Sequence, residues 1–267
     1  MRTALVTGAS SGIGRACAVA LVGEGWRVLA GVRSAGDAPE RTEEVLLDVT
    51  EPEQIREAAG RVEALDGLVN NAGIALSAPL ELVPPEELRY QLEVNLVGQI
   101  AVTQAFLPAI RRAKGRIVFV GSIAGRSALP FLGPYAASKH ALEAVTDSLR
   151  VELRPFGIHV SIVEPGTIKT KIWSTSAARA ERLIADMDGR LAELYGDRIA
   201  AFRQIAMRRG ANAAPVEKVV KVVLDALTAE RPSTRYLVGR DARLRAGFER
   251  LPDRVRDRIY ERVLLKS

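Results

Sequence analysis

Short apolar runs rich in β-branched residues alternate along the chain with longer amphipathic segments, and this alternation is the feature that most restricts the fold. The runs with the length and composition of buried strands are residues 3–7, 27–32, 44–49, 67–73, 116–122, 158–166 and 235–239. Helical patterns occupy residues 12–24, 52–64, 86–113, 135–154 and 215–229. Strands that are apolar throughout are buried on both faces, and repeated strand–helix–strand units join parallel strands through right-handed crossovers. The sequence therefore predicts an α/β fold: a doubly wound, seven-stranded parallel sheet with helices on both faces.

The chain is long enough for one large domain, and no segment rich in Gly, Pro and Ser divides it. Its 267 residues are 48% hydrophobic, which provides a sizeable core. We expect a single domain over residues 1–267. Two segments interrupt the alternation: residues 167–214, expected to form a helical lid, and residues 240–267, an amphipathic C-terminal extension.

The C-terminal extension repeats apolar residues at four-residue spacing, at Val255, Ile259 and Val263. A stripe of this kind packs on the domain, meets another subunit or touches a membrane surface. Acidic residues interleave the arginines of the extension, so we rank the three alternatives in that order.

Composition excludes several classes of function. The net charge of +6 comes from scattered arginines without an aromatic-interleaved basic stripe, so nucleic-acid binding is not expected. Cys17 has no partner for a disulfide, and His140 and His159 lie apart from any cluster with metal-ligand spacing. No apolar run reaches the roughly 18 residues that span a bilayer, and the N-terminus lacks a signal-peptide layout. We expect a cytoplasmic protein with no metal and no integral membrane association.

A glycine-rich turn follows the first predicted strand. The segment "TGASSGIG" places Gly8, Gly12 and Gly14 where a helix must begin. Glycines permit a tight turn and a close backbone approach, and the helix N-terminus offers free N–H groups to a pyrophosphate. In this position after a strand and before a helix, the motif predicts a Rossmann-type dinucleotide site, in which Ser10, Ser11 and Ile13 complete the turn.

The end of the second strand indicates which dinucleotide binds. Sites for the non-phosphorylated cofactor place an acid there for the ribose 2′-hydroxyl, but this strand ends in Val32, Arg33 and Ser34. A guanidinium binds a 2′-phosphate through charge-assisted hydrogen bonds. The sequence therefore predicts NADP(H) as the preferred cofactor. Asp37 lies near enough to leave NAD(H) as an alternative.

Two further strand ends carry residues suited to a nucleotide. The third strand brings Asp48 to accept a hydrogen bond from an adenine amino group, with Val49 beside it. The fourth ends in "NNAG", where Ala72 and Gly73 let a cofactor lie against backbone and Asn70 supplies an amide. Asn70 or Asn71 could instead only tie neighbouring strands together, and for Asn71 this alternative is equal in weight.

Tyr135 and Lys139 stand four positions apart in a helical pattern, thirteen residues after Ser122 at the end of the fifth strand. Side chains at this spacing meet on one face of a helix. A phenol titrates near ~10, and an ammonium within about 4 to 6 Å lowers that pKa by roughly 1 to 3 units. We therefore expect Lys139 to adjust Tyr135 for proton transfer, while Ser122 aligns a carbonyl or hydroxyl oxygen.

These motifs together resemble the short-chain dehydrogenase/reductase family. The similarity covers roughly residues 3–240 and rests on "TGASSGIG", "NNAG", "VNLVG", Ser122, "YAASK" and "PGTIKT" in the order the family has them. The resemblance implies hydride transfer between a nicotinamide and a carbonyl or alcohol carbon. Within this mechanism Tyr135 is the general acid/base, Lys139 tunes it and binds the nicotinamide ribose, and Ser122 orients the substrate oxygen.

The resemblance also implies roles for residues outside the Tyr–Lys pair. Asn95 would hold a water in a proton relay, and a polar residue that bends its helix is the alternative reading. Four residues match the segment around the nicotinamide carboxamide: Pro165, Gly166, Ile168 and Thr170. Helices 86–113 and 135–154 correspond to a subunit interface, so a homodimer or homotetramer is expected.

Apolar residues gather where a substrate would lie: Leu76, Leu129, Phe131, Ile172 and Trp173. A mostly apolar pocket suits a lipophilic ketone, aldehyde or alcohol. The long C-terminal part and the "GPYAASKHALEAVTDSLRVEL" run are most similar to the hydroxysteroid and retinol dehydrogenase branch.

Two alternatives remain open: a 3-oxoacyl thioester reductase, or a non-catalytic NADP(H)-sensing interaction protein. The thioester reductase would need a basic mouth for a phosphopantetheine. The basic run "RRAKGR" at 111–116 precedes the fifth strand and so lies at the wrong end of the sheet.

Overall fold

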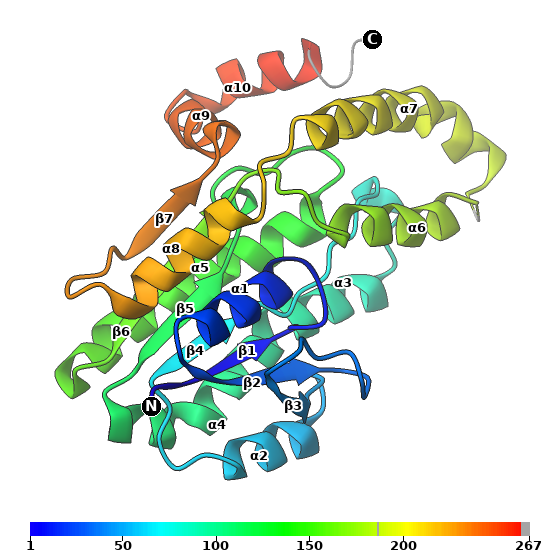
Figure 1. The fold of residues 1–267 in the computed structure, drawn as a ribbon. Helices are drawn as coiled ribbons and strands as arrows, with labels where there is room; N and C mark the ends of the chain where they lie inside the picture. Colours follow the sequence, from blue (N-terminus) through cyan, green and yellow to red (C-terminus); the bar gives the residue numbers. More distant parts are fainter. Residues whose placement is uncertain (186, 263–267) are drawn as a thin grey trace.

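The computed structural model describes residues 1–185 and 187–262 and contains one seven-stranded sheet in which every pairing is parallel. Its strand order is β3-β2-β1-β4-β5-β6-β7 (Figure 1). The strands are β1 Thr3–Thr7, β2 Arg27–Val32, β3 Glu43–Leu46, β4 Gly67–Asn70, β5 Arg116–Val120, β6 His159–Pro165 and β7 Arg235–Val238. The predicted doubly wound parallel sheet is confirmed.

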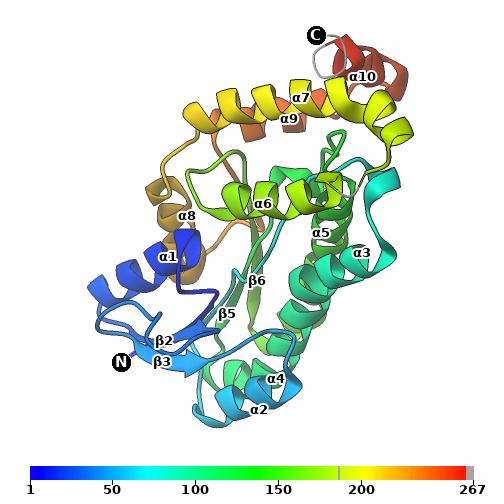
Figure 2. The same cartoon turned by 90° about the vertical axis from the view of Figure 1, so that its right-hand side faces the viewer.

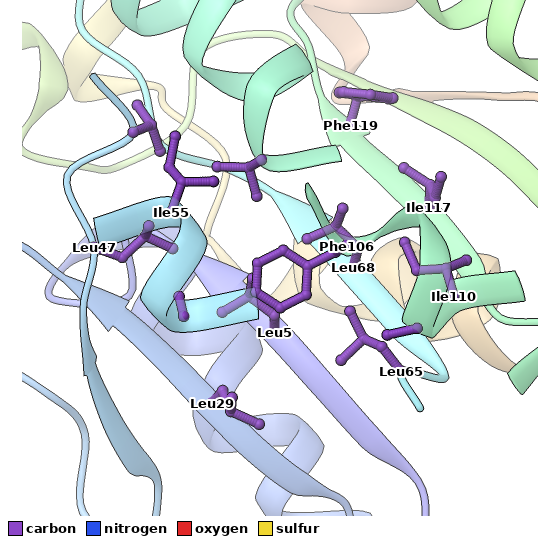
Figure 3. Close-up of a cluster of buried hydrophobic side chains, with 14 of the residues drawn as sticks. Leu5, Leu29, Leu47, Ile55, Leu65, Leu68, Phe106, Ile110, Ile117 and Phe119 are labelled. Carbon is purple, nitrogen blue, oxygen red and sulfur yellow. The ribbon is translucent and has the colours of Figure 1, made fainter. Parts of the chain in front are cut away.

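Helices cover both faces of the sheet and enclose one core on each side. One face carries α1 (Gly12–Gly23) and α8 (Glu217–Thr228), and the other carries α2 (Pro52–Gly60), α4 (Gly98–Ala113) and α5 (Gly133–Leu153). Figure 3 shows part of the second core, which contains Leu5, Leu29, Leu47, Ile55, Leu65, Leu68, Phe106, Ile110, Ile117 and Phe119. Burial on both faces explains why the strands carry apolar residues without alternation.

Several elements are shorter than the sequence pattern predicts. β3 ends at Leu46 and β4 at Asn70, so residues 47–49 and 71–73 leave the sheet as loops at its carboxyl edge. The predicted helix 86–113 is interrupted: α3 (Pro85–Leu92) passes through a π-helical turn at Glu93–Val97 before α4 begins. A π turn inserts one extra residue into a helix, a change that hydrophobic periodicity does not register.

The segments outside the strand–helix alternation form four further helices above the carboxyl edge of the sheet (Figure 2). The lid consists of α6 (Ile172–Ala185) and α7 (Gly189–Ala211), and its ends are joined where Ala214 pairs with Ile168. The C-terminal extension consists of α9 (Arg240–Phe248) and α10 (Asp253–Tyr260).

The C-terminal extension packs on the domain, the first of the expected alternatives. The Arg245 guanidinium donates to the Ser127 carbonyl oxygen at 2.5 Å, and Tyr260 packs against Leu129 and Leu132. Val263 lies outside the described residues. No helix in the described ranges has both the length and the apolar character needed to span a bilayer.

We predict that Phe106→Ala lowers the free energy of unfolding by about 3–5 kcal/mol, because Phe106 is fully buried in the second core and its removal leaves a cavity. Phe156 is half exposed and provides the matched control. Urea unfolding followed by circular dichroism measures both variants. A loss from Phe156→Ala as large as that from Phe106→Ala would contradict this account of the core.

Candidate active site

A cleft of about 290 Å³ opens at the carboxyl edge of the sheet. It lies where the chain changes direction between β1 and β4, the position at which doubly wound sheets bind their ligands. The predicted cofactor residues that line it are Gly8, Ser10, Ser11, Gly12, Ile13, Arg33, Asp48, Val49, Ala72, Gly73, Tyr135, Lys139, Pro165, Gly166, Ile168 and Thr170. Residues from six separate segments therefore meet around one space.

The glycine turn has the geometry that a phosphate group requires. Gly8 and Gly12 have φ of +64° and +54°, a region in which a side chain is strained. At Gly14 a Cβ atom would lie 2.3 Å from the Gly8 carbonyl oxygen, so only glycine lets α1 pack this closely on the end of β1. Ser11 makes no side-chain capping bond, and the first turn of α1 carries no acidic residue. The first N–H groups of α1 thus suit a pyrophosphate.

Gly14 and Asn70 support the cleft from behind instead of lining it. The Asn70 amide nitrogen donates to Thr103 Oγ1 at 2.8 Å, and the side chain is fully buried. Asn71 does line the cleft, and its amide nitrogen also donates to the carbonyl oxygens of Thr7 and Gly8 at 2.9 and 3.2 Å. The contacts of Asn71 are therefore those of the strand-tying alternative, and the residue also lines the cleft.

The loop after β2 presents a cation to the cleft. Arg33 is exposed and lines it, whereas Asp37 does not. The Asp37 loop is folded back by Glu44, whose carboxylate accepts from the Gly36 N–H at 2.8 Å. Arg15, which the sequence reasoning missed, donates to the Asp37 carbonyl oxygen at 3.4 Å and so places a second guanidinium beside this loop. The sequence feature that could have pointed to Arg15 is its position one residue after the glycine turn.

Ser122, Tyr135 and Lys139 converge at the inner end of the cleft, as their spacing predicts. All three are buried. Lys139 Nζ donates to the Val120 carbonyl oxygen at 2.9 Å and lies 5.9 Å from the centre of the Tyr135 ring. Ser122 Oγ accepts from the Ala124 N–H at 3.1 Å, which fixes the hydroxyl at the end of β5.

The electrostatics of this group differ from the expectation. Burial raises the pKa of Tyr135 above its ordinary value, although a hydrogen bond from Ser122 and the charge of Arg245 act in the opposite direction. Burial also lowers the pKa of Lys139 to about 8, while Glu143 opposes that change. In this arrangement desolvation outweighs the neighbouring charges, so the pKa of Tyr135 lies above its ordinary value instead of below it. The adjustment of Tyr135 by Lys139 stays a prediction.

Asn95 lies in the π-helical turn and is fully buried. Its Oδ1 accepts from the Ile74 N–H at 2.8 Å, and its Nδ2 donates to the Ile74 carbonyl oxygen at 2.9 Å and to Ser138 Oγ at 3.0 Å. Ser138 in turn donates to the Tyr135 carbonyl oxygen at 2.8 Å. Asn95 thus connects the loop after β4 to the turn of α5 that carries Tyr135.

A second cavity of about 180 Å³ adjoins the cleft, under the lid and the C-terminal extension. Leu129, Phe131 and Trp173 line this cavity as predicted, Ile172 lines the cleft, and Leu76 is buried away from both. The residues that line both spaces are Ser122, Tyr135, Gly166 and Trp173. The Trp173 ring meets the Tyr135 ring edge-on, with centroids 5.8 Å apart. The phenol and the serine hydroxyl therefore stand at the junction of a nucleotide-sized cleft and an apolar pocket.

A buried carboxyl pair lies next to this junction, and sequence reasoning did not find it. Glu143 follows Lys139 by one turn of α5, and Glu164, the next-to-last residue of β6, has no exposed side-chain surface. Arg235 lies 3.1 Å from Glu143 and 3.5 Å from Glu164, and Arg126 pairs with Glu164 at 2.7 Å. Burial and the charge of Glu164 raise the pKa of Glu143 to about 7. No sequence pattern signals this pair, because its members come from separate elements.

The sheet order, the glycine turn and the cleft at the switch point define the class: a Rossmann-type dinucleotide-binding protein. No group of His, Cys, Asp or Glu side chains that would hold a metal ion occurs within residues 1–185 and 187–262.

Comparison with known proteins extends this assignment. The family model for short chain dehydrogenases matches residues 2–181. The chain is 36% identical to an NADPH-dependent 3-dehydrocapnine reductase of Ornithobacterium rhinotracheale, covering 100% of this chain and 98% of that protein. It is 39% identical to human retinol dehydrogenase 16, covering 90% and 81% of the two chains. A short chain dehydrogenase from Burkholderia cenocepacia, solved in complex with NADP, superposes with a TM-score of 0.76 at 30% identity over 99% of both chains.

The chain belongs to the short-chain dehydrogenase/reductase family. It is an NAD(P)-dependent oxidoreductase, and the resemblance inferred from its motifs is confirmed.

We predict that Glu143→Gln removes part of the pH dependence of stability. The folded-state pKa of Glu143 lies above its ordinary value, so its contribution is present at low pH and is lost as pH rises through about 7. Between about pH 5 and about pH 8 the wild type should lose about 1–3 kcal/mol relative to the variant. Urea titrations at both pH values measure this. Glu152→Gln, an exposed position on the same helix, should follow the wild type. If the free energy of unfolding changed equally with pH in the wild type and in Glu143→Gln, the raised pKa of Glu143 would be refuted.

Proposed function

We propose that the chain is an NADP(H)-dependent oxidoreductase that interconverts a lipophilic ketone or aldehyde and the corresponding alcohol, with Tyr135 as general acid/base. The observation that carries the proposal is the position of Tyr135 and Ser122 at the junction of the cleft and the apolar cavity. A carbonyl group at this junction would meet Tyr135, a proton donor on the protein, next to the cleft whose residues would hold the nicotinamide. When bound, the cofactor supplies or accepts the hydride.

The chain's own residues manage the proton and the substrate oxygen. Ser122 Oγ donates a hydrogen bond to the carbonyl oxygen and orients it toward the phenol. Tyr135 Oη gives its proton to the alkoxide that forms during reduction. Burial raises the pKa of Tyr135, so the phenol is protonated at neutral pH, which is the form from which it can donate a proton. Lys139 places its ammonium where the resulting phenolate needs positive charge.

We assign Asn95 a positioning role, since its amide binds Ile74 and Ser138 and so holds the Tyr135 turn of α5 against the loop after β4. The water-holding role in a proton relay that the resemblance implies for Asn95 stays a prediction.

The preference for NADP(H) rests on charge. Arg33 lines the cleft just after β2, Arg15 stands beside the same loop, and Asp37 is not among the residues that line the cleft. A guanidinium at this position, with no acid from the same loop in the cleft lining, suits a 2′-phosphate. The relatives named as NADPH-dependent or solved with NADP agree with this preference, and NAD(H) is the alternative.

The apolar cavity favours a lipophilic substrate, in keeping with the names of the retinol dehydrogenase and reductase relatives. A 3-oxoacyl thioester reductase is less favoured, because the basic run at 111–116 ends α4 and begins β5 at the amino edge of the sheet, opposite the cleft. A non-catalytic NADP(H) sensor is less favoured because Ser122, Tyr135 and Lys139 converge. A homodimer or homotetramer through α4 and α5, in the cytoplasm, completes the proposal.

Tyr135→Phe tests the mechanism. Removing the hydroxyl that carries the proton should lower kcat by about 10²- to 10⁴-fold while NADPH binding is retained. Turnover is followed by NADPH absorbance with a panel of steroid, retinoid, quinone and acyl carbonyl compounds, and cofactor binding by fluorescence. Tyr236→Phe, on β7 away from both cavities, is the control and should keep its activity. Unchanged turnover in Tyr135→Phe would remove the tyrosine from the mechanism. If the wild type binds NADPH but turns over no compound in the panel, the result would favour the non-catalytic NADP(H) sensor.

Arg33→Glu tests the cofactor preference. Losing charge-assisted hydrogen bonds to a 2′-phosphate should raise the KM for NADPH by about 10- to 100-fold, with little change for NADH. Parallel steady-state assays with both cofactors measure the ratio. Arg56→Gln, an exposed arginine on α2, should leave the ratio as in the wild type. An equal change in the KM for NADPH and for NADH in Arg33→Glu would show that Arg33 does not bind the 2′-phosphate.

A further inference from the structure

The charged residues around the apolar cavity are all of one sign. Among the described residues that line it, Arg203, Arg209 and Arg245 carry charge, and no Asp, Glu, Lys or His accompanies them. Most of the remaining lining is apolar. A cavity meant only for a neutral lipid needs no cation, because an unpaired charge beside an apolar pocket is costly to desolvate.

Arg245 is the most enclosed of the three arginines. It is half-buried on α9, with Nε donating to Ser127 Oγ at 3.3 Å and Nη2 to the Ser127 carbonyl oxygen at 2.5 Å. Both partners are neutral. Within residues 1–185 and 187–262 no carboxylate forms an ion pair with it. Arg126 and Arg235, by contrast, have carboxylate partners.

The nearest acid on the same helix is already engaged. Asp241 precedes Arg245 by one turn, and its Oδ2 accepts from the Thr167 N–H at 2.6 Å. Burial, together with the nearby charge of Arg209, lowers the pKa of Arg245 to about 10. Arg245 therefore remains a cation at neutral pH. The charge of Asp241 acts on it from a distance, but no carboxylate among the described residues forms an ion pair with it.

A buried hydroxyl in the same cavity also has no partner. Ser176, on α6 of the lid, is 2% exposed, and its Oγ makes no hydrogen bond within the described chain. Buried hydroxyls are normally hydrogen-bonded, so a cavity-lining hydroxyl without a partner leaves a donor and acceptor for a polar group on the ligand. This observation is independent of the arginines.

We propose that the cavity binds an amphipathic carbonyl or alcohol compound that carries an anionic group, with Arg245 as the principal partner of that group. The inference rests on the proposed function and narrows its substrate class to lipophilic compounds with a carboxylate, sulfonate or phosphate. Arg209 adds charge from the lid, and Ser176 supplies a hydroxyl donor. The apolar part of the substrate packs on Leu129 and Phe202.

The reacting carbon lies close to the anionic group in such a substrate. Arg245, Ser122 and Tyr135 line one cavity of about 180 Å³. The substrate therefore carries its ketone a short way along the chain from the anion, with the longer apolar part beyond it.

The experiment compares straight-chain oxo fatty acids, with the ketone at successive positions from the carboxylate, with the corresponding neutral primary amides. At the preferred ketone position the wild type should reduce the carboxylate with a kcat/KM about 10- to 100-fold above that for the amide. Arg245→Gln should bring this ratio close to one, and Arg245→Lys should keep part of it. Arg243→Gln, an exposed position on the same helix, should leave the ratio unchanged. Repeating the assay with alkyl sulfonates and alkyl phosphates identifies the anion.

A purely structural role of Arg245, holding α9 on Ser127, would lower activity toward acid and amide together and leave their ratio intact. That result, or equal wild-type activity toward both, would overturn the proposal. Calorimetric titration of the acid and the amide into the protein with NADP⁺ present provides a reading that does not need turnover. Selective binding of the acid without reduction would refute the proposed function but support the anion site, and equal binding of both would refute the anion site.

Discussion

All seven strands end at the same edge of the sheet, and every proposed site residue depends on that constraint. Because the pairings are all parallel, loops far apart in the sequence meet there: the glycine turn after β1, the segment at 71–73 after β4, Ser122 after β5 and Gly166 after β6. The close packing of Gly14 on the Gly8 carbonyl oxygen then fixes α1 so that its N-terminus opens into the cleft. Sheet direction thus determines where chemistry is possible before any side chain is considered.

Tyr135 illustrates how burial and charge compete at that edge. The phenol lies beneath Trp173 of the lid and beside Ser122, so desolvation raises its pKa even though Arg245 and the serine hydroxyl act against the change. The same burial lowers the pKa of Lys139 to about 8. Desolvation therefore shifts both groups toward their neutral forms, although a pKa of about 8 leaves Lys139 mostly protonated at neutral pH. A protonated phenol beside this ammonium is in the form that donates a proton.

Much of the fold and most of the candidate site could be predicted from the sequence, because apolar runs and glycine spacing report on the local backbone. What could not be predicted depends on contacts between distant segments. Asn70 and Asn71 are adjacent in sequence, yet only Asn71 faces the cleft, because alternate residues at a strand end point in opposite directions. The π turn at Asn95 and the core position of Leu76 could not be predicted for a similar reason, since hydrophobic periodicity does not show which neighbour a side chain contacts.

The substrate cavity extends beyond the part of the chain that the family model covers. That model ends at residue 181, whereas Ile184, Phe202, Arg209 and Arg245 come from the rest of the lid and from the C-terminal extension. The cleft is formed by strand ends held rigidly in the sheet, while these helices reach the core through a few contacts such as those of Arg245 with Ser127 and of Tyr260 with the leucines below it. The cavity-lining residues of α7 and α9 do not line the cleft, so they can change without disturbing the nucleotide site, whereas Ile172 and Trp173 of α6 line the cleft. The proposed substrate selectivity therefore depends mainly on α7 and on the C-terminal extension.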